Sequence, residues 1–312
     1  MTVTARAIVT RLRSRALRTT GWRDAAAHQA FLIPIIIVFV VLFLVPLAQS
    51  FYWSFTDFNG YSSDVNFVGL ANYVKLFTDS SLLAGLTFTL LFAVGITVGV
   101  TMIAIPLAVA LNKRFFGRNL ARSVFFFPAV PSMLVLGLVW AYILSPLDTG
   151  ALNTVLDKFG GGGPVAWLAA TGLARMSVIV VGIWGLAGWH AVLYLAYLQS
   201  IPHEYYEAAT IDGASGPQQF WKITLPLLTP AIVISQFLLL THGLKIFDLP
   251  FALTGGGPGF ATFTITQSII VTGVSQGHYG LASALAVVFT LTVAVLAISQ
   301  VTLMRVLERR VT

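Results

Sequence analysis

Several long stretches of the chain carry no formally charged residue, and each is long enough to cross a membrane as a helix. About 20 apolar helical residues span the roughly 30 Å of hydrocarbon in a bilayer. Stretches of this kind lie at 31–54, 82–112, 123–147, 176–202 and 223–244. The pattern therefore predicts five membrane-spanning helices before residue 245.

A further charge-free run, 249–304, is too long for a single crossing. As one helix it would extend for roughly 84 Å at 1.5 Å per residue, so we expect it to break at 255–259 (GGGPG), since glycine and proline both end helices. A sixth span is predicted near 281–304. The short apolar segment 263–272 is expected to belong to the loop or to the start of that span. The predicted fold class is an all-α integral membrane protein with six transmembrane helices.

Composition supports this class. Hydrophobic residues make up 57% of the 312 residues and charged residues only 9%, whereas ordinary soluble domains contain about 25% charged residues. A chain of this composition cannot cover a water-facing surface, which excludes a secreted enzyme and a soluble nucleic-acid-binding protein. The absence of cysteine excludes disulfides, a thiolate nucleophile and cysteine-ligated zinc.

The positions of the basic residues predict the orientation of the chain. Six spans place both termini on one side, together with the 113–122 and 203–222 loops, and that side carries fourteen of the eighteen Lys and Arg residues. Short cytoplasmic loops are enriched in Lys and Arg, so both termini are expected to be cytoplasmic. The net charge of +7 is explained by topology, with no nucleic acid as partner. The basic tail 1–30 either lies on anionic membrane lipid or only holds the N-terminus inside.

The predicted cytoplasmic loop 201–226 contains signals for two short helices. Pro202 suits a first helical turn, and Glu204 and Glu207 lie near the N-terminus, where the helix dipole favours negative charge. Asp212-Gly213 is a turn dipeptide. Pro217 then suits the start of a second helix, which we expect to end at Leu225-Pro226.

Small side chains give this two-helix elbow a face that another backbone can approach closely. They are Ala208, Ala209 and Ala214. We therefore expect the elbow to fit a groove on another molecule.

The same loop carries a specific resemblance. Its Glu207-Ala-Ala, Asp212-Gly-Ala, Ile223 and Leu225-Pro resemble, without gaps, the EAA motif of ABC importer permeases. Segments 67–73, 125–128 and 253–258 are similar to the carbohydrate-uptake branch, the maltose and glycerol-phosphate type permeases. These similarities extend over about 31–305, so the resemblance covers nearly the whole chain.

The resemblance implies a role for the elbow and a set of partners. In that family the elbow docks in a groove of a separate ATPase subunit, so Glu207 and Asp212 would supply polar contacts or hold the elbow's shape. Gly213 would allow the turn, and Ala208 and Ala209 the close approach. The alternative for Glu207 is a helix N-terminal charge without a partner.

The implied assembly is a permease domain (31–312) in the cytoplasmic membrane of a bacterium or archaeon. Its implied partners are a second permease in a heterodimer, two ATPase subunits, an external solute-binding protein and a sugar or polyol. No cofactor is expected in this chain, because ATP and Mg would be bound by the partner subunits.

No catalytic or metal site is expected in the chain itself. Two glycine clusters, 160–163 and 255–257, are each followed by proline and lack the lysine of a P-loop. The five histidines form no HxxxH or HExxH pair. We therefore predict a protein that is not an enzyme.

A substrate path needs polar or aromatic groups inside the helix bundle, where ionisable side chains are costly and often functional. The candidates lie in the fourth and fifth spans and at the outer end of the fifth. They are Trp184, His190, Gln236, His242, Lys245 and Asp248. The resemblance places a sugar site on the helices before and after the EAA loop, with a tryptophan near position 184.

Each candidate has a structural alternative. His190 would bond a neighbouring helix, and Lys245 with Asp248 would form an interfacial pair at i, i+3. For the whole chain, the alternative functions are an ABC permease for a non-sugar solute and, less favoured, an ion-coupled secondary transporter. The ion-coupled reading is disfavoured because spans one to five contain no Asp or Glu.

Overall fold

The computed structural model describes residues 31–62, 64–161 and 163–311, with side chains to residue 302. The predicted basic tail 1–30 lies outside these residues. The regular secondary structure of these described residues is helical, apart from one isolated antiparallel bridge between Thr56 and Phe67. It divides into two compact units, one ending at Trp53 and the other beginning at Ser54.

The described part of the first unit is one continuous helical segment. It consists of α3 (Ile33–Phe39), the π-helical turn η1 (Val40–Leu44) and α4 (Val45–Trp53). No residue of α3, η1 or α4 is buried. The segment is long and apolar enough to cross a membrane. This agrees with the predicted first span.

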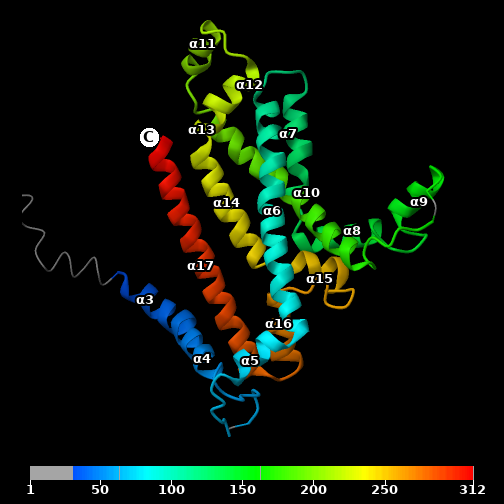
Figure 1. The fold of residues 1–312 in the computed structure, drawn as a ribbon, viewed down its shortest axis with the longest axis vertical. Helices are drawn as coiled ribbons and strands as arrows, with labels where there is room; N and C mark the ends of the chain where they lie inside the picture. Colours follow the sequence, from blue (N-terminus) through cyan, green and yellow to red (C-terminus); the bar gives the residue numbers. More distant parts are fainter. Residues whose placement is uncertain (1–30, 63, 162, 312) are drawn as a thin grey trace, which may run out of the picture. The chain divides into compact units, whose positions relative to one another are not determined.

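The second unit contains the remaining helices (Figure 1). Before the elbow these are α5 (Ala71–Thr78), α6 (Ser80–Asn112), α7 (Arg118–Phe126), η2 (Phe127–Ala129), α8 (Met133–Ile143), α9 (Ala151–Lys158) and α10 (Thr171–Leu198). The elbow comprises α11 (Glu204–Ile211), α12 (Gly216–Gln219), η3 (Phe220–Thr224) and α13 (Leu225–Leu227). After it come α14 (Thr229–Leu244), α15 (Asp248–Thr254), α16 (Ile265–Ile270), η4 (Val271–Ser275) and α17 (Tyr279–Val311).

Four of the described helices are long and apolar enough to cross a membrane, and two bent pairs raise this number to six if each pair is one span. The segment 123–147 was expected to be a single helix, and this is wrong. The helix ending in η2 meets α8 at an angle of 92°. Pro131 has no backbone N–H and so cannot continue the helical hydrogen-bond pattern, and the chain turns to extended geometry at Ser132, with φ −64° and ψ 152°. Ser132 then caps α8 by accepting the backbone N–H of Val135.

The predicted break at Leu225-Pro226 is also displaced. The helix continues through Pro226, directly after the π-helical turn η3, and bends by 64° before α14. The bend at Leu228 precedes Pro230, which suits the first turn of a new helix.

Two expectations about loops need correction. The segment 263–272 is neither loop nor the start of the last span, because α16 and η4 form their own short helix before α17 begins at Tyr279. Arg175 precedes the predicted span 176–202, yet it lies within α10, and its Nε donates a 2.9 Å hydrogen bond to the carbonyl of Ala261. This bond ties α10 to the segment after the glycine-rich loop.

The core of the second unit is formed where α6 packs against α10 and α14 (Figure 1). A Cβ on Gly182 of α10 would lie 3.0 Å from the ring of Phe92, and one on Gly243 of α14 would lie 2.6 Å from Cα of Ala93. Small residues that let helix backbones approach are typical of membrane helix packing. The two glycines therefore fix how closely both helices approach α6.

Candidate functional site: a coupling elbow and a polar pocket

The turn of the elbow is closed by backbone hydrogen bonds at the end of α11. The N–H of Ala214 donates to the carbonyl of Ala209 at 2.8 Å, and that of Gly213 donates to Thr210 at 3.0 Å. This pair of bonds defines a Schellman motif, which needs a left-handed residue after the helix. Gly213 supplies it with φ +78°, and a Cβ there would meet nothing within 4 Å. The position therefore requires glycine for its backbone conformation.

Side chains then join the two helices of the elbow. Ser215 and Gln218 form a capping box at the start of α12. Gln219 Nε2 donates to Thr210 Oγ1 and to the carbonyl of Ala214, both at 3.1 Å. Tyr206 of α11 hydrogen-bonds Thr224 of η3, also at 3.1 Å between the two oxygens. The elbow is therefore held as one unit by its own contacts.

The predicted coupling residues lie together on this unit. Glu207, Ala208, Asp212 and Gly213 are exposed, and Ala209 is partly buried. Beside them Ile211 is 87% exposed. An apolar side chain flanked by carboxylates and small residues forms a surface suited to contact with another protein.

Three of the six path candidates line one pocket. His242 and Lys245 at the end of α14 and Asp248 at the start of α15 surround a cavity of about 470 Å³, together with Thr241 and Met133. This pocket combines an imidazole, a cation and an anion with a hydroxyl group, so it can donate to and accept hydrogen bonds from a polar solute.

His190 takes part in a buried polar cluster instead. Its Nδ1 lies 2.7 Å from Ser235 Oγ, and the hydroxyl of Tyr194 donates to the same oxygen at 2.7 Å. All three side chains are buried. Ser235 therefore joins α14 to two positions on α10. Gln236, the next residue, is partly buried and lines none of the pockets described here.

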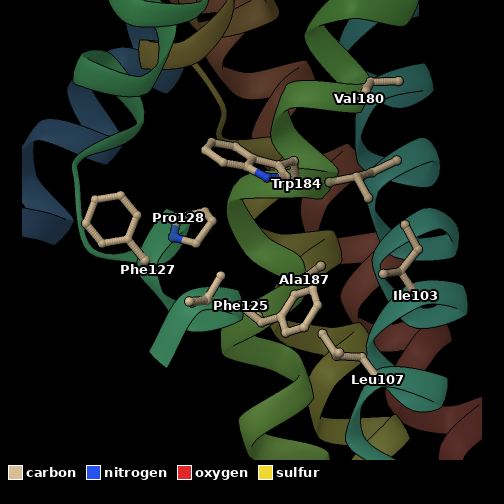
Figure 2. Close-up of a pocket in the computed structure, with 11 residues that line it drawn as sticks. Ile103, Leu107, Phe125, Phe127, Pro128, Val180, Trp184 and Ala187 are labelled. Atoms are coloured by element: carbon tan, nitrogen blue, oxygen red, sulfur yellow. The ribbon is translucent and has the colours of Figure 1, made fainter. Parts of the chain in front are cut away.

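Trp184 lies apart from His242, on a different cavity. An apolar groove of about 650 Å³ runs between α6, α7 with η2, and α10 (Figure 2). Its lining residues are Ile103, Leu107, Val124, Phe125, Phe127, Pro128, Val180, Ile183, Trp184, Ala187 and Gly188. Trp184 also makes an edge contact with Trp140, with ring centroids 5.3 Å apart. The structure thus separates the predicted tryptophan from the polar pocket.

Sequence reasoning missed Ser235 and the role of Tyr194. One signal was present: His190 and Tyr194 are four residues apart and therefore share a helix face. A lone serine on an apolar helix carried no comparable signal. Among the described residues, no group of three or more His, Cys, Asp and Glu side chains could hold a metal ion.

The helical architecture, the projecting elbow and the pocket at the end of α14 suit a subunit of a membrane transporter. Residues 95–312 match the family described as "Binding-protein-dependent transport system inner membrane component". The chain belongs to this family, whose curated members include permease subunits of ABC transporters.

Individual relatives match over most of their length. The chain is 34% identical to the probable starch degradation products transport system permease protein of Thermoanaerobacterium thermosulfurigenes, over 90% of this chain and 94% of the relative. It is also 34% identical to the multiple sugar-binding transport system permease protein of Streptococcus mutans, over 89% and 95%. A solved bacterial alginate ABC transporter, in complex with an alginate pentasaccharide-bound periplasmic protein, matches with a TM-score of 0.76. That match has 26% identity and covers 94% of this chain and 98% of the other.

The buried cluster predicts a measurable effect of Ser235→Ala. The change leaves the His190 and Tyr194 side chains without their shared partner, and loss of such a bond between membrane helices costs about 1 kcal/mol. The midpoint of thermal unfolding in detergent should fall. Ser299→Ala, at an exposed position of α17, is the control and should leave the midpoint unchanged. Equal midpoints for both variants would show that the cluster does not hold α10 to α14.

Proposed function

We propose that this chain is the permease subunit of an ABC importer that takes up a sugar or related polyol. The observation that carries the proposal is its 34% identity, over about nine-tenths of the chain, to permeases named for starch degradation products and for multiple sugars. The alginate transporter with its loaded periplasmic protein supports the same substrate class. A permease for a non-sugar solute is the alternative. The ion-coupled alternative is overturned by membership of a binding-protein-dependent family.

The proposed topology has six spans, counting each bent pair as one, with both termini in the cytoplasm. The fourteen-to-four distribution of basic residues supports it. A cavity beneath the elbow is lined by Lys113 at the end of α6 and by His203 and Tyr206 at the elbow. The basic 113–122 loop and the elbow therefore lie at the same end of the unit, as this topology requires. Residues 31–312 form the permease domain and 201–226 its coupling loop.

The proposed complex contains a second permease, two ATPase subunits and an external solute-binding protein, in the cytoplasmic membrane of a bacterium or archaeon. ATP and Mg are bound by the ATPase subunits. The elbow, with Glu207, Ala208, Ala209, Asp212 and Gly213, docks on one ATPase and passes its movement to α10 and α14. The exposure and internal bonding of the elbow support this role, because a rigid projection transmits displacement.

The substrate path is proposed to pass the polar pocket of His242, Lys245 and Asp248. Their mixed hydrogen-bonding groups suit a polyhydroxylated solute. Phe247 lines the same pocket, and its ring stacks on that of Phe251 with centroids 5.0 Å apart. His190 on α10 and Gln236 on α14 are proposed to shape the path between these two helices, where His190 bonds Ser235. Contact between Trp184 and the sugar stays a prediction, and it competes with the occupant proposed below for the groove that Trp184 lines.

The docking role predicts that Glu207→Lys abolishes coupling. A groove of the ATPase subunit that binds the Glu207 carboxylate would be unfavourable for a lysine. The ATPase subunit should therefore no longer co-purify, and uptake should be lost. Glu204→Lys is the matched control, because Glu204 lies on the same helix, is exposed and stands outside the motif. Retained ATPase binding and uptake in Glu207→Lys would refute the docking role.

The substrate class is tested by uptake in reconstituted vesicles. A panel of labelled mono- and oligosaccharides, amino acids and inorganic ions, supplied with the cognate binding protein, should show ATP-dependent entry of a saccharide alone. His242→Ala should reduce that uptake by about tenfold, because one lost hydrogen bond to a bound polar group is worth this much. Uptake of an amino acid or ion in place of every saccharide would contradict the proposal.

A further inference from the structure

The apolar groove around Trp184 is unsuited to a sugar. None of its eleven lining residues carries a hydrogen-bonding side chain except Trp184 itself, through the indole N–H. A hydroxyl group buried there would lose its bonds to water without replacement, which costs free energy. A long hydrocarbon chain has no such cost. The groove lies between segments of the proposed second, third and fourth spans, and acyl chains are the solvent around such spans.

The groove depends on a close contact between the end of α7, at Phe125, and Gly188 of α10. A Cβ on Gly188 would collide with the backbone carbonyl of Phe125, so only glycine lets α7 cross α10 here. Phe127 and Pro128 then form one wall, Ile103 and Leu107 the opposite wall, and Trp184 lies toward one end (Figure 2). The cavity is therefore a defined feature of the packing.

A basic loop adjoins the other end of this groove. Lys113 and Arg114 lie in the connection between α6 and α7, and Arg118 is the first residue of α7. The sequence has no Asp or Glu from 80 to 147. Arg114 and Arg118 line a shallow hollow together with Phe116, whose side chain is fully exposed. The turn is made by Gly117 with φ +80°. A cationic hollow beside an exposed aromatic ring is typical of a site at the headgroup level of a membrane.

Helix α7 connects the two features. Leu120 and Val124 are exposed on one face of α7, four residues apart, and Val124 and Phe125 line the groove. From Arg118 to Val124 the helix advances by roughly 9 Å at 1.5 Å per residue. Leu120, which lines the hollow, and Val124, which lines the groove, therefore link the two features along one apolar face of α7.

We propose that this surface binds one anionic phospholipid. The phosphate-bearing headgroup lies at Arg114 and Arg118, and one acyl chain follows α7 past Val124 into the groove toward Trp184. Two observations favour this occupant. The basic hollow at Arg114 and Arg118 complements an anionic headgroup, and the apolar face of α7 leads from this hollow to an uncharged apolar groove that suits an acyl chain. The bound lipid fills the space between α7 and α10, and so supports the crossing that Gly188 allows.

The test uses the complete transporter in nanodiscs of phosphatidylcholine with a small fraction of phosphatidylglycerol. The phosphatidylglycerol carries a photoreactive diazirine on its acyl chain, and peptide mass spectrometry locates the adducts after irradiation. We expect adducts on the peptides that contain Ile103 to Leu107 and Trp184 to Ala187. Excess unlabelled phosphatidylglycerol should compete, whereas excess phosphatidylcholine should not.

Variants separate the two parts of the site. Arg114→Gln with Arg118→Gln should lower adduct yield by roughly tenfold, because each basic residue near an anionic headgroup contributes a severalfold factor. Lys158→Gln, on the distant helix α9, is its control. Ala187→Leu should fill the groove and reduce labelling there, while Ala294→Leu on an exposed position of α17 should not.

Three results would overturn the proposal. One is equal labelling by a phosphatidylcholine probe that carries the same diazirine. Another is that, in the unmodified transporter, excess phosphatidylcholine competes with the probe as effectively as excess phosphatidylglycerol does. This experiment does not depend on the folding of any variant. The last is cross-linking of a photoreactive residue at position 184 to the second permease or to a sugar probe in place of lipid.

Discussion

The close contact of α10 and α14 with α6 is the constraint on which the rest of the second unit depends. Gly182 and Gly243 allow this contact, and Ser235 joins the two outer helices through His190 and Tyr194. Lipid supplies no hydrophobic drive for helix association, so packing of small residues and shared hydrogen bonds must provide it. The elbow connects α10 to α14, and the polar pocket lies at the far end of α14. The same core therefore supports both sites.

The elbow is proposed to transmit movement to the core helices α10 and α14. The Schellman turn at Gly213, the Gln219 to Thr210 bond and the Tyr206 to Thr224 bond fix α11 against α12 and η3. Movement applied at the exposed carboxylates would then reach α14 without being absorbed in the loop. The proposed phospholipid acts on the other face of α10, where α7 crosses it.

Local chemistry in the sequence predicted the elbow well, because proline, acidic residues and an Asp-Gly turn act over a few neighbouring positions. Charge-free length likewise located the long spans. The break between Ala129 and Met133 was missed because proline is common in membrane helices, and only tertiary neighbours decide whether a proline such as Pro131 kinks or interrupts one. The separation of Trp184 from His242 was missed for another reason. Membrane helices are apolar on all sides, so periodicity does not reveal which face meets which neighbour.

The central claim is that the elbow passes the movement of an ATPase subunit to α14, which requires the elbow and α14 to move as one body. The most direct test places spin labels at Ile211 on the elbow and Ile234 on α14, both exposed, in the assembled transporter, and compares their distance distribution by pulsed electron paramagnetic resonance. The account predicts the same narrow distribution in the nucleotide-free and ATP-bound states of a complex that still transports. A distribution that shifts or broadens on ATP binding would show that the elbow bends independently, and would contradict the account.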